Sequence, residues 1–431
     1  MLLQLPDELL DAIAANLRRS RSWATAEGLR VKEDQMSFSL ICRRCRNIGQ
    51  AHAFRDLVYS FRYAKDGQRW PSLDSSEMLP MDPSWKSLEY YPHTSLPMLR
   101  DFFKEHPFLG TSMRRLRLVG YPGDNNSIIE SRCGDLVQFA DNDLTDVLFF
   151  HNLLSLLPSL QELQLADFFL ALPEGYWQAP CIAPQSLKRL LIEYPHGKQY
   201  EDHAADIIAC FNFVDEVLVS NLDRPEVEDF AVVPRRLDLT SFAFFGDTVV
   251  TGRLFQHILA SPATQTLRKL DIGFIQPDSP AHAAFKELLH AVGPQLEHFG
   301  LNVTGRWQGD TSISLKLDLS PCINLRSLLF RLFIRKDFDV AEGITNTSRT
   351  CRSCGFLQTI TIETSDIFEP TLSIRKIEDE LLVLKKRIPL SVVRIRTPLL
   401  DIYPPLTPAN VEQLKRCFPR LVEQNLLDTP S

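Results

Sequence analysis

The chain lacks any apolar run long enough to cross a membrane. Its most apolar stretch, Val147 to Leu157, is short and contains His151 and Asn152, whereas a membrane-spanning helix needs about 20 consecutive apolar residues. The first residues include acids where a secretory signal has a basic segment. We therefore expect no membrane partner and a location in the cytoplasm, the nucleus or both, without secretion.

Positive charge is not in excess either. The chain has 47 Lys and Arg residues against 54 Asp and Glu residues, for a formal net charge of −7. Proteins that bind nucleic acid without sequence preference take their affinity from a basic face. The charge balance thus predicts that nucleic acid is not the partner.

Cysteines are too few, and odd in number, for a disulfide framework. Nine of them in a long chain fit free thiols in a reducing compartment. Cys42 and Cys45, and likewise Cys351 and Cys354, have the spacing of a metal-binding pair. The two pairs lie far apart in the sequence, however, and a structural zinc site needs four ligands. We predict no metal.

No recognisable catalytic motif is present. The sequence contains no phosphate-binding loop, dinucleotide fingerprint, His-Glu-x-x-His helix or Gly-x-Ser-x-Gly turn. Its histidines are scattered, and none pairs with a serine or cysteine in a familiar order. The sequence therefore predicts a non-enzymatic protein without cofactors. An enzyme with its active site in the loops is the alternative, for which no residues are identified.

What the sequence does contain begins at its N-terminus with three short amphipathic segments. The first has apolar residues at every fourth position, which form one stripe on a helix: Leu5, Leu9, Ile13 and Leu17. Pro6 suits a first helical turn because its missing N–H has no partner to lose there. The second segment carries Leu40, Ile41 and Cys42 among arginines, and residues 48–57 form a third with helical spacing.

This pattern resembles the F-box. The shared features are Leu-Pro-x-Glu-Leu-Leu-x-x-Ile, then Leu-Ile-Cys-Arg-Arg-Cys-Arg, then Phe-x-x-Leu. Cys45 stands where the family usually has tryptophan, and residues 18–34 are longer and more polar than the usual link. The resemblance implies that the helices dock on the small SCF adaptor and, through it, on a cullin. It implies the following adaptor contacts: Leu5, Pro6, Leu9, Ile13, Leu17, Leu40, Ile41 and Cys42.

A second pattern fills most of the remaining chain. Its unit is an apolar residue, two others, an apolar residue, one other and an apolar residue. The unit starts at these residues: Met113, Leu160, Leu187, Val214, Leu239, Leu267, Leu296, Leu325, Leu357 and Leu390. Most of the spacings lie within or near the period of about 20–29 residues that leucine-rich repeats have. Residues 54–59 fit as an earlier, degenerate copy.

The unit predicts a strand with one apolar face, because side chains alternate along a strand. Such strands must stack on their neighbours to bury that face. Amphipathic helices are expected between them, at residues 143–157, 202–211, 251–259, 281–292 and 371–386. Another is expected at 96–106. Irregular loops are expected at residues 18–34, 64–93, 120–141 and 335–353.

The predicted fold is α/β: a three-helix F-box followed by a curved repeat solenoid with a parallel sheet inside and helices outside. It resembles the irregular leucine-rich repeats of fungal and animal F-box proteins. The expected domains are the F-box (1–57), a connecting segment with the degenerate repeat (58–112), the repeats (113–406) and a helical C-terminal cap (407–431). Separate βαβ units are the alternative.

Together the two resemblances imply the substrate receptor of an SCF-type ubiquitin ligase, which binds an unknown target through the repeats. The alternative is a leucine-rich scaffold without a role in ubiquitin transfer. Residues between the apolar strand positions face the concave side. A basic cluster near the last three repeats predicts an acidic target segment there. The expected target contacts are Lys269, His298, Arg331, Arg394 and Arg396.

Overall fold

The structure, a computed structural model, contains two compact units, residues 1–193 and 194–431. It describes residues 10, 43–62, 96–121, 145–166, 168, 170–171, 186–193, 204, 207–208, 210–220, 237–245, 252–273, 275, 280–302, 317–332, 340–364, 372–396 and 407–428. Within this part of the chain, no helix is long and apolar enough to cross a lipid bilayer.

The first unit builds a parallel sheet in the order β1-β2-β4-β6. Its strands are β1 (Asp56–Arg62), β2 (Arg115–Tyr121), β4 (Glu162–Ala166) and β6 (Ser186–Glu193), with a separate short pair β3 (Thr145–Asp146) and β5 (Leu170–Ala171). Its helices are α3 (Arg43–Ala53), α4 (Leu96–Glu105), α5 (Pro107–Ser112) and α7 (Val147–Ser155).

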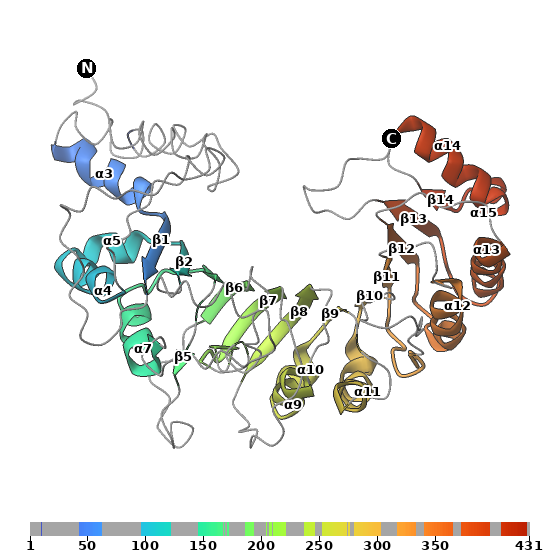
Figure 1. The fold of residues 1–431 in the computed structure, drawn as a ribbon, viewed down its shortest axis with the longest axis horizontal. Coiled ribbons are helices and arrows are strands. Elements are labelled where there is room, and N and C mark those ends of the chain that lie inside the picture. The colour runs from blue at the N-terminus through green and yellow to red at the C-terminus, as the bar shows by residue number, and fades with distance from the viewer. Residues whose placement is uncertain are drawn as a thin grey trace, which may run out of the picture. The chain divides into compact units, whose positions relative to one another are not determined.

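The second unit repeats the same construction in the order β7 to β14. Its strands are β7 (Phe213–Ser220), β8 (Asp238–Phe245), β9 (Lys269–Ile272), β10 (His298–Asn302), β11 (Ser327–Leu332), β12 (Thr359–Thr364), β13 (Val392–Arg396) and β14 (Leu427–Asp428). Its helices are α9 (Gly252–Leu259), α10 (Ala263–Thr266), α11 (Pro280–Val292), η5 (Gly293–Gln295), α12 (Val340–Thr350), η6 (Cys351–Ser353), α13 (Leu372–Lys385), α14 (Pro408–Cys417) and α15 (Pro419–Glu423). Helices α9, α11, α12 and α13 lie on one side of this sheet (Figure 1).

The predicted repeat is confirmed at every copy from Met113 onward. All of its apolar positions are buried, and those of neighbouring strands stand in register. One row across the second unit consists of Leu270, Phe299, Leu328, Ile360 and Val393. The α/β architecture of parallel strands alternating with helices follows from that register, because each strand buries its apolar face only beside the next.

The helices bury the second layer of the core. In α11 the buried residues recur at helical spacing: Ala281, Ala284, Phe285, Leu288, Leu289 and Val292. Phe285 links three elements, since its ring centroid lies 5.2 Å from that of Phe255 on α9 and 6.3 Å from that of Phe299 on β10. Aromatic packing thus joins α11 both to the neighbouring helix α9 and to strand β10.

Three expectations need correction. Residues 335–353, expected as a loop, contain α12, whose buried face includes Thr347 and Ser348 beside Ile344; these polar residues concealed the helical period. The predicted helix at 48–57 ends at Ala53, and Leu57 lies in β1, in agreement with the strand expected for the degenerate copy at 54–59. The C-terminal tail contains the expected helices, but it also adds β14 beside β13, which was not predicted.

Candidate functional site

The residues between the apolar strand positions lie on the face of the sheet opposite α9, α11, α12 and α13, here called the front face. This placement follows from the alternation of side chains along a strand. The five predicted target contacts all lie on the front face of β9 to β13. Lys269 and His298 are exposed direct neighbours across β9 and β10.

Arg331 on β11 is held by two carboxylates. Its Nη1 and Nη2 donate to the two carboxylate oxygens of Asp271 on β9, with 2.6 Å from Nη2 to Oδ2, and its Nε donates to Glu363 Oε2 at 2.9 Å. The three side chains are 13%, 7% and 3% exposed. A guanidinium with both its fork and its Nε engaged is fixed in position, so Arg331 is a structural element of the front face.

The same carboxylate of Glu363 also binds Arg396 on β13. Arg396 Nε donates to Glu363 Oε1 at 2.9 Å, and Arg396 Nη2 lies 2.6 Å from the same oxygen. Glu363 stands directly between Arg331 and Arg396 in the parallel register of β11, β12 and β13. One buried carboxylate therefore ties three neighbouring strands together.

Arg394 completes the charged set at the C-terminal end. Its Nε donates to Asp428 Oδ2 on β14 at 2.8 Å, and both side chains are about half exposed, at 44% and 48%. We call these six residues the charged ladder: Asp271, Arg331, Glu363, Arg394, Arg396 and Asp428. An exposed pair of this kind contributes little to stability, so Arg394 is the ladder arginine most accessible to a ligand.

Gly300 makes the ladder possible. It lies on β10, where it pairs with Asp271 on β9. Arg331 lies on β11, the strand on the other side of β10. A Cβ atom at this position would lie 2.7 Å from Asp271 Cγ, closer than carbon atoms approach. The glycine thus leaves the space through which the Asp271 side chain reaches across β10 to Arg331.

The surroundings of these residues shift two pKa values. Burial lowers the pKa of Arg331, but its hydrogen bonds and attraction to Asp271 and Glu363 outweigh that effect and raise the pKa above its usual range. Burial lowers the pKa of His298, with a smaller opposing effect from Glu297. His298 is therefore held toward its neutral form, while Arg331 stays charged.

The ladder revises the expected basic cluster. The sequence brings Arg331, Arg394 and Arg396 to one end of the sheet as predicted, but each of them faces an acid. The acidic partners were not predicted from the sequence. Asp271 comes from two strands away from Arg331, and Asp428 lies on β14, which was not predicted.

In the first unit, side chains at the strand positions between the apolar ones also make polar contacts. Asp56 on β1 accepts two hydrogen bonds from Arg115 on β2, at 2.9 Å from Nε and 2.5 Å from Nη2. Glu193 on β6 accepts from Gln164 at 2.8 Å and from Arg117 at 3.3 Å. Arginine–carboxylate contacts between strands thus recur in both units.

The predicted adaptor contacts lie outside the described residues, and they stay predictions: Leu5, Pro6, Leu9, Ile13, Leu17, Leu40, Ile41 and Cys42. Of the segments around them, the structure describes Leu10 and the helix from Arg43 onward. Leu10 and Cys45, the residue at the usual tryptophan position, are both buried.

The cysteines in the described part of the chain are buried. Burial raises the pKa of the Cys322 thiol to about 12, so that thiol stays protonated at neutral pH. Cys351 and Cys354 donate to the backbone carbonyls of Thr347 and Leu319, respectively. Among the described residues, no three His, Cys, Asp or Glu side chains stand together as metal ligands would. These thiols serve as core packing.

Comparison with known proteins adds little to this description. No protein-family model and no curated protein sequence matches the chain. Among solved structures, it is similar to one chain in a crystal structure of the Rad7 and Elc1 complex in yeast. The two are 13% identical, the match covers 93% of this chain and 92% of that chain, and the TM-score is 0.29. A likeness at that TM-score supports no conclusion about function.

Proposed function

We propose that this chain is the substrate-recognition subunit of an SCF-type cullin-RING ubiquitin ligase. One combination supports the proposal: an N-terminal sequence that resembles the F-box, in front of a leucine-rich array whose predicted register is confirmed. The first provides a docking surface for the small adaptor protein, and the second provides a broad polar face for a target.

The receptor would act without a nucleophile of its own. By holding a target beside the conjugating enzyme, it raises the effective concentration of the target's lysines at the reaction centre. The front face suits this role, because its arginines are fixed by carboxylates and present a preformed surface. We propose that a target segment contacts the exposed residues Lys269, His298 and Arg394 on this face, beside Arg331 and Arg396.

The adaptor interaction is tested by the double substitution Leu9→Asp with Ile13→Asp. Two carboxylates in an apolar interface cost several kcal/mol, enough to abolish a micromolar affinity. We expect the variant to lose the adaptor and cullin in co-purification while its repeat array stays folded. The matched control is Val383→Asp with Val422→Asp, since both valines are exposed on the C-terminal helices. Wild-type adaptor recovery with the Leu9/Ile13 variant would contradict the proposal.

The same experiment separates the receptor from a scaffold that plays no part in ubiquitin transfer. That alternative is favoured by Cys45, which provides a much smaller side chain than the tryptophan usual in the F-box. A scaffold would bind its partners without stoichiometric adaptor or cullin.

The target site is tested separately by photo-crosslinking. A photo-crosslinking residue in place of Lys269 should capture ubiquitinated protein, whereas the same residue in place of Lys286 on α11 should not.

A further inference from the structure

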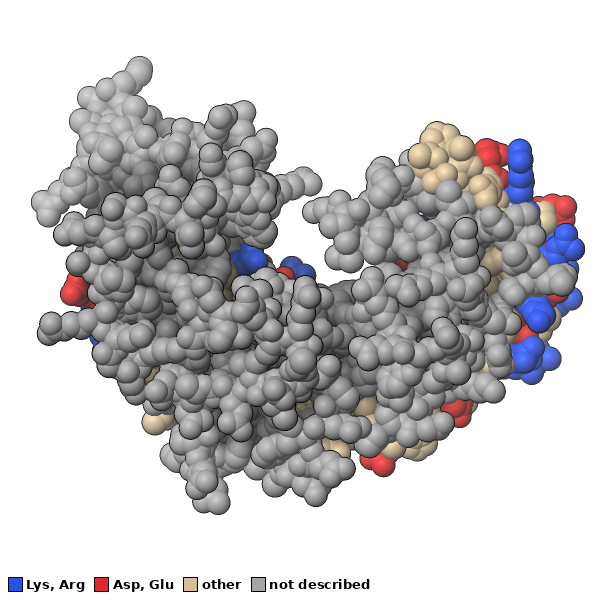
Figure 2. Space-filling view, viewed as in Figure 1, with Lys and Arg blue, Asp and Glu red and all other residues tan. Residues whose placement is uncertain are grey.

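A concentration of positive charge lies on the opposite side of the second unit from the front face. Figure 2 shows Lys and Arg side chains, with Asp and Glu side chains among them, over the C-terminal helices. In and just after α13, four exposed cations make no ion pair with any described residue: Arg375, Lys376, Lys386 and Arg387. In a chain with a net charge of −7, this local excess needs an explanation.

The acids of α13 do not neutralise these cations, because neighbouring arginines already hold them. Glu378 and Asp379 bind Arg420 on α15. Glu380 is shared by two arginines of the α12 end, Arg349 at 3.2 Å and Arg352 at 3.6 Å.

Helix stability does not account for the position of Arg375 either. Arg375 lies at the end of the first turn of α13, which has no acid. The positive end of the helix dipole disfavours a cation there, whereas the negative end favours Lys386 and Arg387. Arg375 thus carries a small cost that no ion pair within the described chain offsets. An external anion would offset it.

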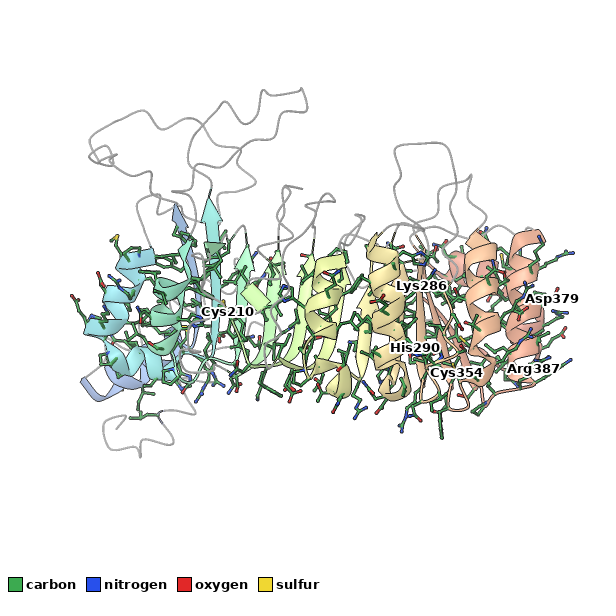
Figure 3. The ribbon with its side chains drawn as sticks, turned by 90° about the horizontal axis from the view of Figure 1, so that it is seen from below. Cys210, Lys286, His290, Cys354, Asp379 and Arg387 are labelled. Atoms are coloured by element: carbon green, nitrogen blue, oxygen red, sulfur yellow. The ribbon has the colours of Figure 1, made fainter. Side chains whose placement is uncertain are left out.

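The geometry of these residues indicates the kind of anion. Lys376, Val383 and Arg387 follow one stripe at i, i+7 and i+11, and Val383 is 37% exposed. The distance along the helix from Arg375 to Arg387 is roughly 18 Å at 1.5 Å per residue, which about six residues of an extended peptide would span. Figure 3 shows Arg387 and Asp379 at the surface of this helix.

An acidic polypeptide fits this stripe better than nucleic acid does. The sequences of α12 and α13 contain no aromatic residue on which bases could stack. Val383, in contrast, offers an apolar contact to a peptide side chain between the two groups of cations.

We propose that the outer face of α13, carrying Arg375, Lys376, Val383, Lys386 and Arg387, binds a polypeptide segment rich in Asp and Glu. This second protein-binding surface consists of other residues than those of the F-box segment and of the front face. It does not depend on the ubiquitin-ligase role, and a receptor or a scaffold could use it equally.

The test uses the full chain and a fluorescein-labelled octaglutamate peptide, with binding followed by fluorescence anisotropy at 50 and 200 mM salt. We expect saturable binding that weakens as salt rises. The variant Lys376→Glu with Arg387→Glu should weaken binding at least tenfold. The matched control, Lys188→Glu with Lys286→Glu, makes the same change in net charge at exposed lysines elsewhere and should change binding less than twofold.

Three outcomes would overturn the proposal: no binding of octaglutamate, equal loss in the control variant, or tighter binding of a twelve-nucleotide single strand than of the peptide. A neutralising variant, Lys376→Gln with Arg387→Gln, guards against misfolding and should give a smaller loss in the same direction. Adaptor co-purification with the Lys376/Arg387 variant should stay at the wild-type level. Failure of this surface is therefore distinguishable from failure of the ubiquitin-ligase role.

Discussion

Replacing Gly300 by alanine should break the contact between Asp271 and Arg331 without altering either residue. The new Cβ would overlap the Asp271 carboxyl group, whose Cγ lies 2.7 Å away. Asp271 is 7% exposed, so a displaced carboxylate gains little water in exchange. Losing two hydrogen bonds to a charged group, each worth about 1.5–3 kcal/mol, implies a loss of roughly 3–6 kcal/mol in the free energy of unfolding.

A double-mutant cycle isolates the cause. Alanine within a strand is normally favoured over glycine by roughly 0.5–1 kcal/mol. With Asp271→Ala already present, the obstructing carboxyl group is gone. Gly300→Ala should then be neutral or slightly stabilising. The coupling between the two substitutions is thus expected to be at least about 2 kcal/mol, which contacting residues can show.

Urea denaturation gives the change in stability, and hydrogen exchange shows whether the loss is local. Exchange is the more direct assay, because long repeat arrays often do not unfold as two-state systems. Faster exchange should be confined to β9, β10 and β11 and their neighbours. Equal destabilisation by Gly300→Ala with and without the Asp271 side chain would refute the reasoning.

Two further predictions concern packing. Leu270→Ala should destabilise the second unit by roughly 2–5 kcal/mol, because Leu270 is fully buried. Lys269→Ala, at the exposed neighbouring residue, should be nearly neutral. Equal shifts of the melting temperature in the two variants would contradict the strand register. Glu378→Ala should cost roughly 3 kcal/mol, because its Oε1 accepts from the backbone N–H groups of Arg420 and Leu421 at 2.7 and 3.0 Å. Glu423→Ala, at an exposed residue of α15, is the control for denaturation midpoints. A similar loss there would argue against a role of Glu378 in capping the start of α15.

The strand register was predictable because it depends on one local property. A leucine two residues from another leucine defines one face of a strand, and that face has to be buried wherever the unit recurs. Leu270, Leu328 and Val393 therefore lie where the pattern put them. Helix α12 was not predictable on the same basis, because its buried face includes Thr347 and Ser348, residues that usually indicate a loop.

The contacts of the front face were less predictable than its residues. Strand alternation is enough to place Arg331, Arg394 and Arg396 on one face. It does not say which acid each arginine meets, since that acid can come from the neighbouring strand, as Glu363 does, or from two strands away, as Asp271 does. The pairing of Asp271 with Arg331 depends on the missing side chain of Gly300, because the Asp271 carboxyl group occupies the position that a Cβ would take. The pairing of Arg394 with Asp428 depends on a strand of only two residues.

The reach of Asp271 across Gly300 has a consequence for cooperativity. Repeat arrays are often described as one-dimensional chains in which each repeat is coupled only to its nearest neighbours. Here an ion pair joins β9 directly to β11, and Glu363 extends the connection to β12 and β13. The array therefore has a next-nearest-neighbour coupling at this point. The repeats from β9 to β13 should unfold as one cooperative unit. Fraying that begins at either end of the array should stop where it reaches this unit.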